Sequence, residues 1–260
     1  MNRPRWSVWV ACLGCAVYAF LYLPLLIVVA YSFNDSRLNA EWDGFTLHWY
    51  DVLANDPDML GAAWNSLMIG AIAAGTSCVL GTLAAIALHR YRPPLLATLV
   101  LAPIAMPEVL MGVSLLLFFV AVNIDLGLTA VALSHITFCV GFVAVVVRAR
   151  LEGLDESLID AARDLGASPL QAGWHVMLPL MLPGVLAGAL LAFTLSMDDF
   201  VVTFFTAGPG QPTLPLQIYS MIRIAVTPEV NAISSILMML TLAVSLTAYR
   251  VSRDVWRAQL

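Results

Sequence analysis

Residues 177–206 read MLPLMLPGVLAGALLAFTLSMDDFVVTFFT, a run whose only charged members are Asp198 and Asp199. The hydrocarbon core of a bilayer is crossed by roughly 20 mainly apolar residues in a helix. This stretch is therefore long enough and apolar enough to predict a membrane-spanning helix. A charged side chain within a membrane span is energetically costly, so the two adjacent acids need a separate explanation.

The rest of the chain has the same character. Of its 260 residues 61% are hydrophobic and 11% are charged, whereas soluble domains average about 45–50% apolar and about 25% charged residues. We expect a single all-α, polytopic transmembrane domain over residues 1–260. Its six predicted spans cover about 7–31, 62–88, 95–121, 128–148, 177–206 and 230–249.

The arginines predict the orientation. The chain has no lysine, and ten of its twelve arginines fall on one side of the predicted spans; the positive-inside rule makes that side the cytoplasm. Both termini are then cytoplasmic. The first span is longer than a signal-peptide core and lacks a clear cleavage site, so we expect a retained anchor. The ten residues are Arg3, Arg5, Arg90, Arg92, Arg148, Arg150, Arg163, Arg250, Arg253 and Arg257.

Several chemistries have no support in the sequence. The four cysteines all lie in apolar runs, where they are expected to pack as small apolar residues, without a disulfide or a metal. We find no glycine-rich phosphate loop and no catalytic constellation. The prediction is a transport subunit, not an enzyme, with no cofactor and no nucleic-acid partner of its own. The cysteines are Cys12, Cys15, Cys78 and Cys139.

The long cytoplasmic loop, residues 149–176, carries a distinctive pattern. Apolar residues recur at helical spacing over 154–165 with acids between them, which predicts a short amphipathic helix. Gly166 is placed to end that helix in a left-handed conformation. Ser168 as N-cap and Pro169 at the first helical position then begin a second helix. On pattern alone the loop is either a docking element for another protein or a connector on the membrane surface.

The loop resembles a motif of the permeases of binding-protein-dependent ABC importers: Glu-Ala-Ala, three residues, Gly, nine residues, Ile-x-Leu-Pro. It stands here as Asp160-Ala161-Ala162, Gly166 and Val176-Met177-Leu178-Pro179, with conservative departures at Asp160 and Val176. The resemblance implies the type I importer permease fold, in which this motif docks on an ATPase subunit. It also implies a second homologous permease, two ATPase subunits that bind the ATP, and an extracytoplasmic solute-binding protein.

Further segments resemble the spermidine/putrescine permeases in particular. They cover most of the chain and imply a polyamine substrate and a location in the bacterial inner membrane. The segments are 32–34, 134–139, 193–199, 214–221 and 228–232.

Three acids interrupt predicted spans: Glu108, Asp198 and Asp199. At a rise of ~1.5 Å per residue, Glu108 and Asp198 lie at similar depths, roughly 20 Å along their spans. We expect no basic partner in the spans at that depth, so the acids predict a site for a cation, lined also by Phe200. Adjacent residues on a helix point about 100° apart, so at most one of the two aspartates should face the pathway squarely. The alternative is that the acids are protonated or pair with a partner subunit.

Three weaker expectations concern other residues. His135 in the fourth span is expected to form hydrogen bonds between helices. The prolines of the third and fifth spans are expected to bend them, with or without a gating role. The acidic outer loop, residues 32–61, is either a docking surface for the solute-binding protein or a solvated loop. The prolines are Pro103, Pro107, Pro179 and Pro183.

Two rival functions remain open. The first is an ABC permease for another small cation. The second is a proton-coupled secondary transporter that uses Glu108 and Asp198 as a relay, although no inverted repeat is evident between the two halves of the chain. An anion importer would be expected to place basic residues in the pathway.

Overall fold

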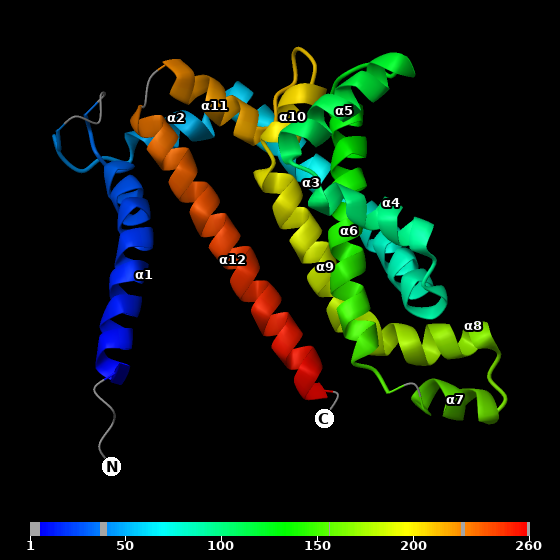
Figure 1. Ribbon diagram of the computed structural model, residues 1–260. Coiled ribbons are helices and arrows are strands. Elements are labelled where there is room, and N and C mark those ends of the chain that lie inside the picture. Colours follow the sequence, from blue (N-terminus) through cyan, green and yellow to red (C-terminus); the bar gives the residue numbers. More distant parts are fainter. Residues whose placement is uncertain (1–5, 37–40, 156, 225–226, 259–260) are drawn as a thin grey trace. The chain divides into compact units, whose positions relative to one another are not determined.

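The computed structural model describes residues 6–36, 41–155, 157–224 and 227–258 (Figure 1). Every regular element in these ranges is a helix. The chain divides into two compact units: residues 1–60 with 218–243, and residues 61–217 with 244–260. An all-α architecture confirms the expected fold class.

The larger unit contains the helices that form the candidate site. In chain order the helices are α3 (Pro57–Tyr91), α4 (Pro94–Ala105), α5 (Glu108–Ala121), α6 (Leu128–Glu152), α7 (Ser157–Asp164), α8 (Pro169–Ala172), the π-helical turn η1 (Gly173–Met177), α9 (Leu178–Asp198), α10 (Val201–Thr206), α11 (Leu214–Ile224) and α12 (Pro228–Ala258). Of these, α3, α11 and α12 belong partly to the smaller unit, because the division of the chain falls within them.

Helix α6 is the central element of the larger unit. It packs along α9, as Figure 1 shows, and also contacts α4, α5 and α10. Close approach depends on small residues: a Cβ atom at Gly141 would lie 2.6 Å from the carbonyl oxygen of Val100 on α4. Lipid chains are as apolar as helix surfaces, so the hydrophobic effect does not drive helices together within a bilayer. Close packing of this kind is a main source of their association.

The described helices account for most of the predicted spans. Four have the length and hydropathy to cross a bilayer, namely Trp9–Tyr31 of α1, α3, α6 and the stretch Pro169–Asp198; α4 and α5 together make a fifth if they form one broken span. The described apolar part of α12, Pro228–Ala243, is shorter. The count of six spans and the placement of the termini therefore stay predictions.

Two predicted spans are interrupted. Helices α4 and α5 meet at a bend of 115°, at Met106 and Pro107, where Pro107 has an extended backbone. A proline disfavours the helical conformation of the residue before it, which accounts for the break at Met106. The fifth predicted span ends as α9 at Asp198, because Asp199 is extended (φ −69°, ψ 120°), and begins again as α10. The predicted bend of the third span is confirmed. In the fifth span Pro179 and Pro183 both lie within α9, and the interruption comes at Asp199 and not at a proline.

The smaller unit contains α1 (Trp6–Tyr31) and α2 (His48–Ala54). Between them, Asn34 organises the outer loop: its side chain donates to the Glu41 carbonyl at 2.7 Å and accepts from the Asp43 N–H at 2.9 Å. The Trp49 indole donates to the Asn34 carbonyl at 2.8 Å. The described part of this acidic loop is therefore folded around a buried asparagine.

Adding one methyl group at Gly141 tests the packing of α6 against α4. In Gly141→Ala the new Cβ must push the two helices apart, which should lower the free energy of unfolding by about 1–3 kcal/mol. The measurement is the thermal midpoint of the purified protein in detergent. Gly75→Ala is the control, because beyond the backbone of its own helix nothing lies within 4 Å of a Cβ there. Equal midpoints for the two variants would contradict the packing.

Candidate functional site

A cavity of about 290 Å³ lies where the two broken spans and α6 meet. Its lining contains all four residues that the sequence predicted for a cation pathway: Glu108, Asp198, Asp199 and Phe200. Aromatic rings of α6 complete one wall, and none of the described lining residues is basic. The α6 rings belong to Phe138 and Phe142.

Glu108 and Asp198 present exposed carboxylates to this cavity. Glu108 lies in the first turn of α5, where the helix macrodipole stabilises a negative charge. Asp198 is the last residue of α9. Among the described residues neither side chain has a hydrogen-bond or ion-pair partner. Two unpaired carboxylates beside aromatic rings form an environment that favours a cation.

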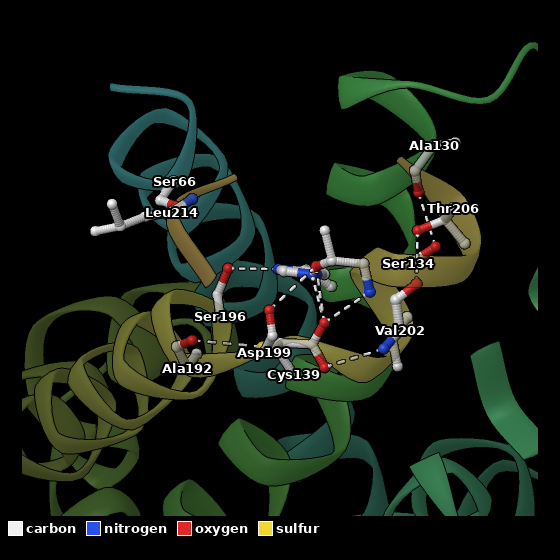
Figure 2. A network of polar contacts seen from close by, with 12 residues as sticks. Ser66, Ala130, Ser134, Cys139, Ala192, Ser196, Asp199, Val202, Thr206 and Leu214 are labelled. Atoms are coloured by element: carbon white, nitrogen blue, oxygen red, sulfur yellow. Dashed lines mark hydrogen bonds and ion pairs between the residues drawn. The ribbon is translucent and has the colours of Figure 1, made fainter. Parts of the chain in front are cut away.

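Asp199 behaves differently from its neighbour, because its side chain is only 7% exposed and faces into the protein. Its Oδ2 accepts hydrogen bonds from the backbone N–H and the hydroxyl of Thr203, both at 2.8 Å. Its Oδ1 accepts a longer bond from the Val202 N–H at 3.4 Å. Figure 2 shows Asp199 within this network, with Val202 beside it. The carboxylate thus ties the break to the first turn of α10. Both aspartates line the cavity, but only Asp198 presents an exposed carboxylate without a hydrogen-bond partner among the described residues.

His135 on α6 is the basic partner that the sequence reading did not foresee. Its Nε2 lies 3.2 Å from Asp199 Oδ2, and the imidazole is 1% exposed. The expectation that no basic residue lies at the depth of the acids is therefore wrong for Asp199. The expected hydrogen bonding between helices is confirmed: His135 contacts Ser196 on α9 and Thr203 on α10. Residues so far apart in sequence give no periodic signal of their contact.

The cytoplasmic motif region forms a second candidate site. Gly166 has φ +95°, the left-handed conformation predicted for it. Ser168 and Gln171 make a reciprocal capping box at the start of α8, which confirms the predicted N-cap. Before α7, Asp155 accepts from the Ser157 N–H at 3.0 Å. Hydrogen bonds from the Ser157 side chain and from its backbone N–H lower the pKa of the Asp155 carboxyl, so it stays charged to a lower pH than a free aspartate.

The predicted motif residues lie on or beside this pair of short helices. Asp160, Ala161, Gly166 and Pro179 are exposed, while Ala162 and Leu178 are half-buried. The sequence reading missed three large apolar side chains here that are exposed to solvent. They are Leu165 at 89%, Leu170 at 81% and Trp174 at 66% exposure. Helical periodicity predicts neither their exposure nor the π-helical turn that contains Trp174.

Comparison with protein families decides the identity of this architecture. Residues 77–256 match the family described as "Binding-protein-dependent transport system inner membrane component". The chain belongs to that family. It is therefore an inner-membrane permease of an ABC importer, and not an enzyme.

Relatives and solved structures agree with this. The permease is 43% identical over 242 residues, 92% of each chain, to the spermidine/putrescine transport system permease protein PotC of Escherichia coli (strain K12). It is 42% identical over 246 residues, 91% of this chain and 86% of the relative, to the putrescine transport system permease protein PotI of the same strain.

Two solved ABC transporters share the fold. One imports the acidic polysaccharide alginate and matches with a TM-score of 0.72 over 98% of this chain and 99% of its own, at 15% identity. The other, the MetNI methionine transporter, matches with a TM-score of 0.65 over 76% of this chain and 96% of its own, at 21% identity. At these identities the likeness concerns the permease fold.

The two adjacent aspartates should respond differently to loss of charge. Asp199→Asn should destabilise the permease by about 1.5–3 kcal/mol, the range for hydrogen bonds to a charged group. Asp198→Asn should leave stability unchanged, because no described residue forms a hydrogen bond or an ion pair with its carboxylate. Thermal midpoints in detergent measure both; a destabilised Asp198→Asn with an unaffected Asp199→Asn would reverse the assignment.

Proposed function

We propose that this permease lines the pathway of an ATP-driven importer of polyamines such as spermidine or putrescine. The observation that carries the proposal is the cavity with two open carboxylates, Glu108 and Asp198, and no basic lining residue among those described. A polyamine has two or more ammonium groups on an apolar stem, which suits paired acids set among aromatic rings.

Electrostatics supports a cationic cargo. Carboxylates within membrane spans are costly unless they face a polar cavity or a partner charge, so a mobile cation is stabilised beside them. Cation–π contacts with rings such as Phe200 add about 0.5–2 kcal/mol. The names of the relatives PotC and PotI, spermidine/putrescine and putrescine permeases, supply the identity of the cation.

The assembly around the permease belongs to the same proposal. It comprises a second homologous permease, two ATPase subunits that bind ATP, and an extracytoplasmic solute-binding protein. Within it, this permease has six spans and both of its termini in the cytoplasm. The alginate transporter has been solved in complex with a periplasmic protein that binds an alginate pentasaccharide. Closure of the ATPase pair would open the pathway outward, and hydrolysis would reset it inward.

Uptake of labelled polyamine by the reconstituted complex tests the pathway. Glu108→Gln and Asp198→Asn should each raise KM roughly tenfold or more, because a hydrogen bond to a charged group contributes about 1.5–3 kcal/mol. Asp125→Asn is the matched control, an exposed acid that does not line the cavity. Unchanged uptake in both cavity variants refutes the proposal. Uptake driven by a proton gradient without ATP would favour the secondary-transporter alternative.

The exposed motif region supports docking on an ATPase subunit. A soluble loop normally keeps large apolar side chains scattered singly, whereas three lie here within ten residues of one another, Leu165, Leu170 and Trp174. Gly166 lies at the turn between α7 and α8, so its left-handed backbone fixes the direction in which α8 leaves the turn. The pair of short helices is thereby held as one rigid docking element.

Gly166→Val should uncouple ATP hydrolysis from transport. A β-branched residue in the left-handed region costs about 1–3 kcal/mol, so the turn changes its conformation and the docking geometry is lost. The measurement is the amount of polyamine imported per ATP hydrolysed. Gly173→Ala is the control, because Gly173 is helical and has no atom near a Cβ. An unchanged ratio in Gly166→Val would argue against docking through this turn.

A further inference from the structure

His135 does not line the cavity, yet its imidazole contacts both helices that flank the break. Its Nδ1 lies 2.7 Å from the Ser196 hydroxyl on α9, two residues before Asp198. Its Nε2 lies 2.9 Å from the Thr203 hydroxyl on α10. Figure 2 shows the dashed contacts gathering between Ser196 and Asp199. One buried side chain from α6 therefore bridges the ends of two helices that the backbone no longer joins as a helix.

A single neutral tautomer of the imidazole satisfies all these contacts. With the proton on Nε2, the ring donates toward Thr203 Oγ1 and Asp199 Oδ2, and Nδ1 accepts the Ser196 hydroxyl proton. The Thr203 hydroxyl can then donate to the Asp199 carboxylate. Each polar group in the network has a partner of the opposite kind, which is what a buried polar cluster needs to specify one geometry.

We propose that His135 is a positioning residue for transport: it fixes the α9–α10 break so that the Asp198 carboxylate is open to the acidic cavity while the Asp199 carboxylate is bonded into the protein at the cavity wall. This inference rests on the proposed function of the cavity as a polyamine site. Its consequence is that the affinity for a polycation depends on a side chain that never touches the cargo.

The reason is geometric. At Asp199 the extended backbone gives the chain a freedom of direction that a continuous α-helix would not have. The bonds from His135 to α9 and to α10 remove that freedom. A displaced Asp198 carboxylate would bind an ammonium group of the cargo less well, because a hydrogen bond weakens steeply with distance and misalignment. Loss of the imidazole should therefore weaken cargo binding more than it slows the transport cycle.

The test compares His135→Ala, His135→Gln and His135→Asn in the complete reconstituted importer, with KM and Vmax for labelled spermidine and putrescine. We expect His135→Ala to raise KM about tenfold or more for both, with a smaller change in Vmax. The glutamine amide reaches toward α10 as Nε2 does, and the asparagine amide lies where Nδ1 contacts α9. Partial recovery of KM by either variant identifies the contact that positions Asp198.

Ser134→Ala is the matched control, because the neighbouring Ser134 hydroxyl is buried but bonds only to the Ala130 carbonyl of its own helix. Its KM should stay at the wild-type value. Ser196→Ala should add nothing to His135→Gln, since both remove the same α9 contact. A wild-type KM in all three His135 variants overturns the inference, as does a loss confined to Vmax or to thermal stability.

Failure of this inference is distinguishable from failure of the proposed function. If Glu108→Gln and Asp198→Asn raise KM and the His135 variants do not, the cavity binds the polyamine and His135 has no positioning role. If neither set affects polyamine uptake, the cavity is not the site and both proposals fall. The glutamine and asparagine variants keep the test decisive if His135→Ala does not assemble, because each retains one of the polar contacts.

Discussion

The Asp199 carboxylate holds the break in the fifth predicted span in place. It accepts bonds from the first turn of α10 and from the α6 imidazole, so a charge that would be costly in a bilayer is satisfied within the protein. The backbone at Asp199 is extended, so α9 ends at the preceding residue, Asp198. The two acids thus have separate roles, one structural and one open to the cavity.

The cavity exists because two helices end at nearly the same place. The third predicted span breaks before Pro107 and starts again at Glu108, and the fifth breaks at Asp199. Irregular backbone at membrane depth is tolerated only where it is buried in protein or lines a polar cavity. Here it does both: the described residues around the breaks pack on α6, and the helix ends present carboxylates to the cavity.

One run of helical residues connects the proposed docking region with the cavity. The π-helical turn that follows α8 leads directly into α9, and α9 ends at Asp198 in the cavity. A π-helical turn is a local irregularity that often occurs at functional positions. Helix α9 therefore lies between the proposed ATPase contact and the acidic residues of the cavity.

The sequence by itself determined the class of protein, because apolar runs of membrane length admit few structures other than helices. It also determined the left-handed turn at Gly166, the cap at Ser168 and the proline break before Glu108, all of which depend on neighbouring residues. Only the tertiary structure decided that the Asp198 carboxylate is exposed at the cavity while the Asp199 carboxylate is buried and contacts His135. These outcomes depend on which side chains α6, α9 and α10 bring together, and contacts between residues distant in the chain leave no trace in local periodicity.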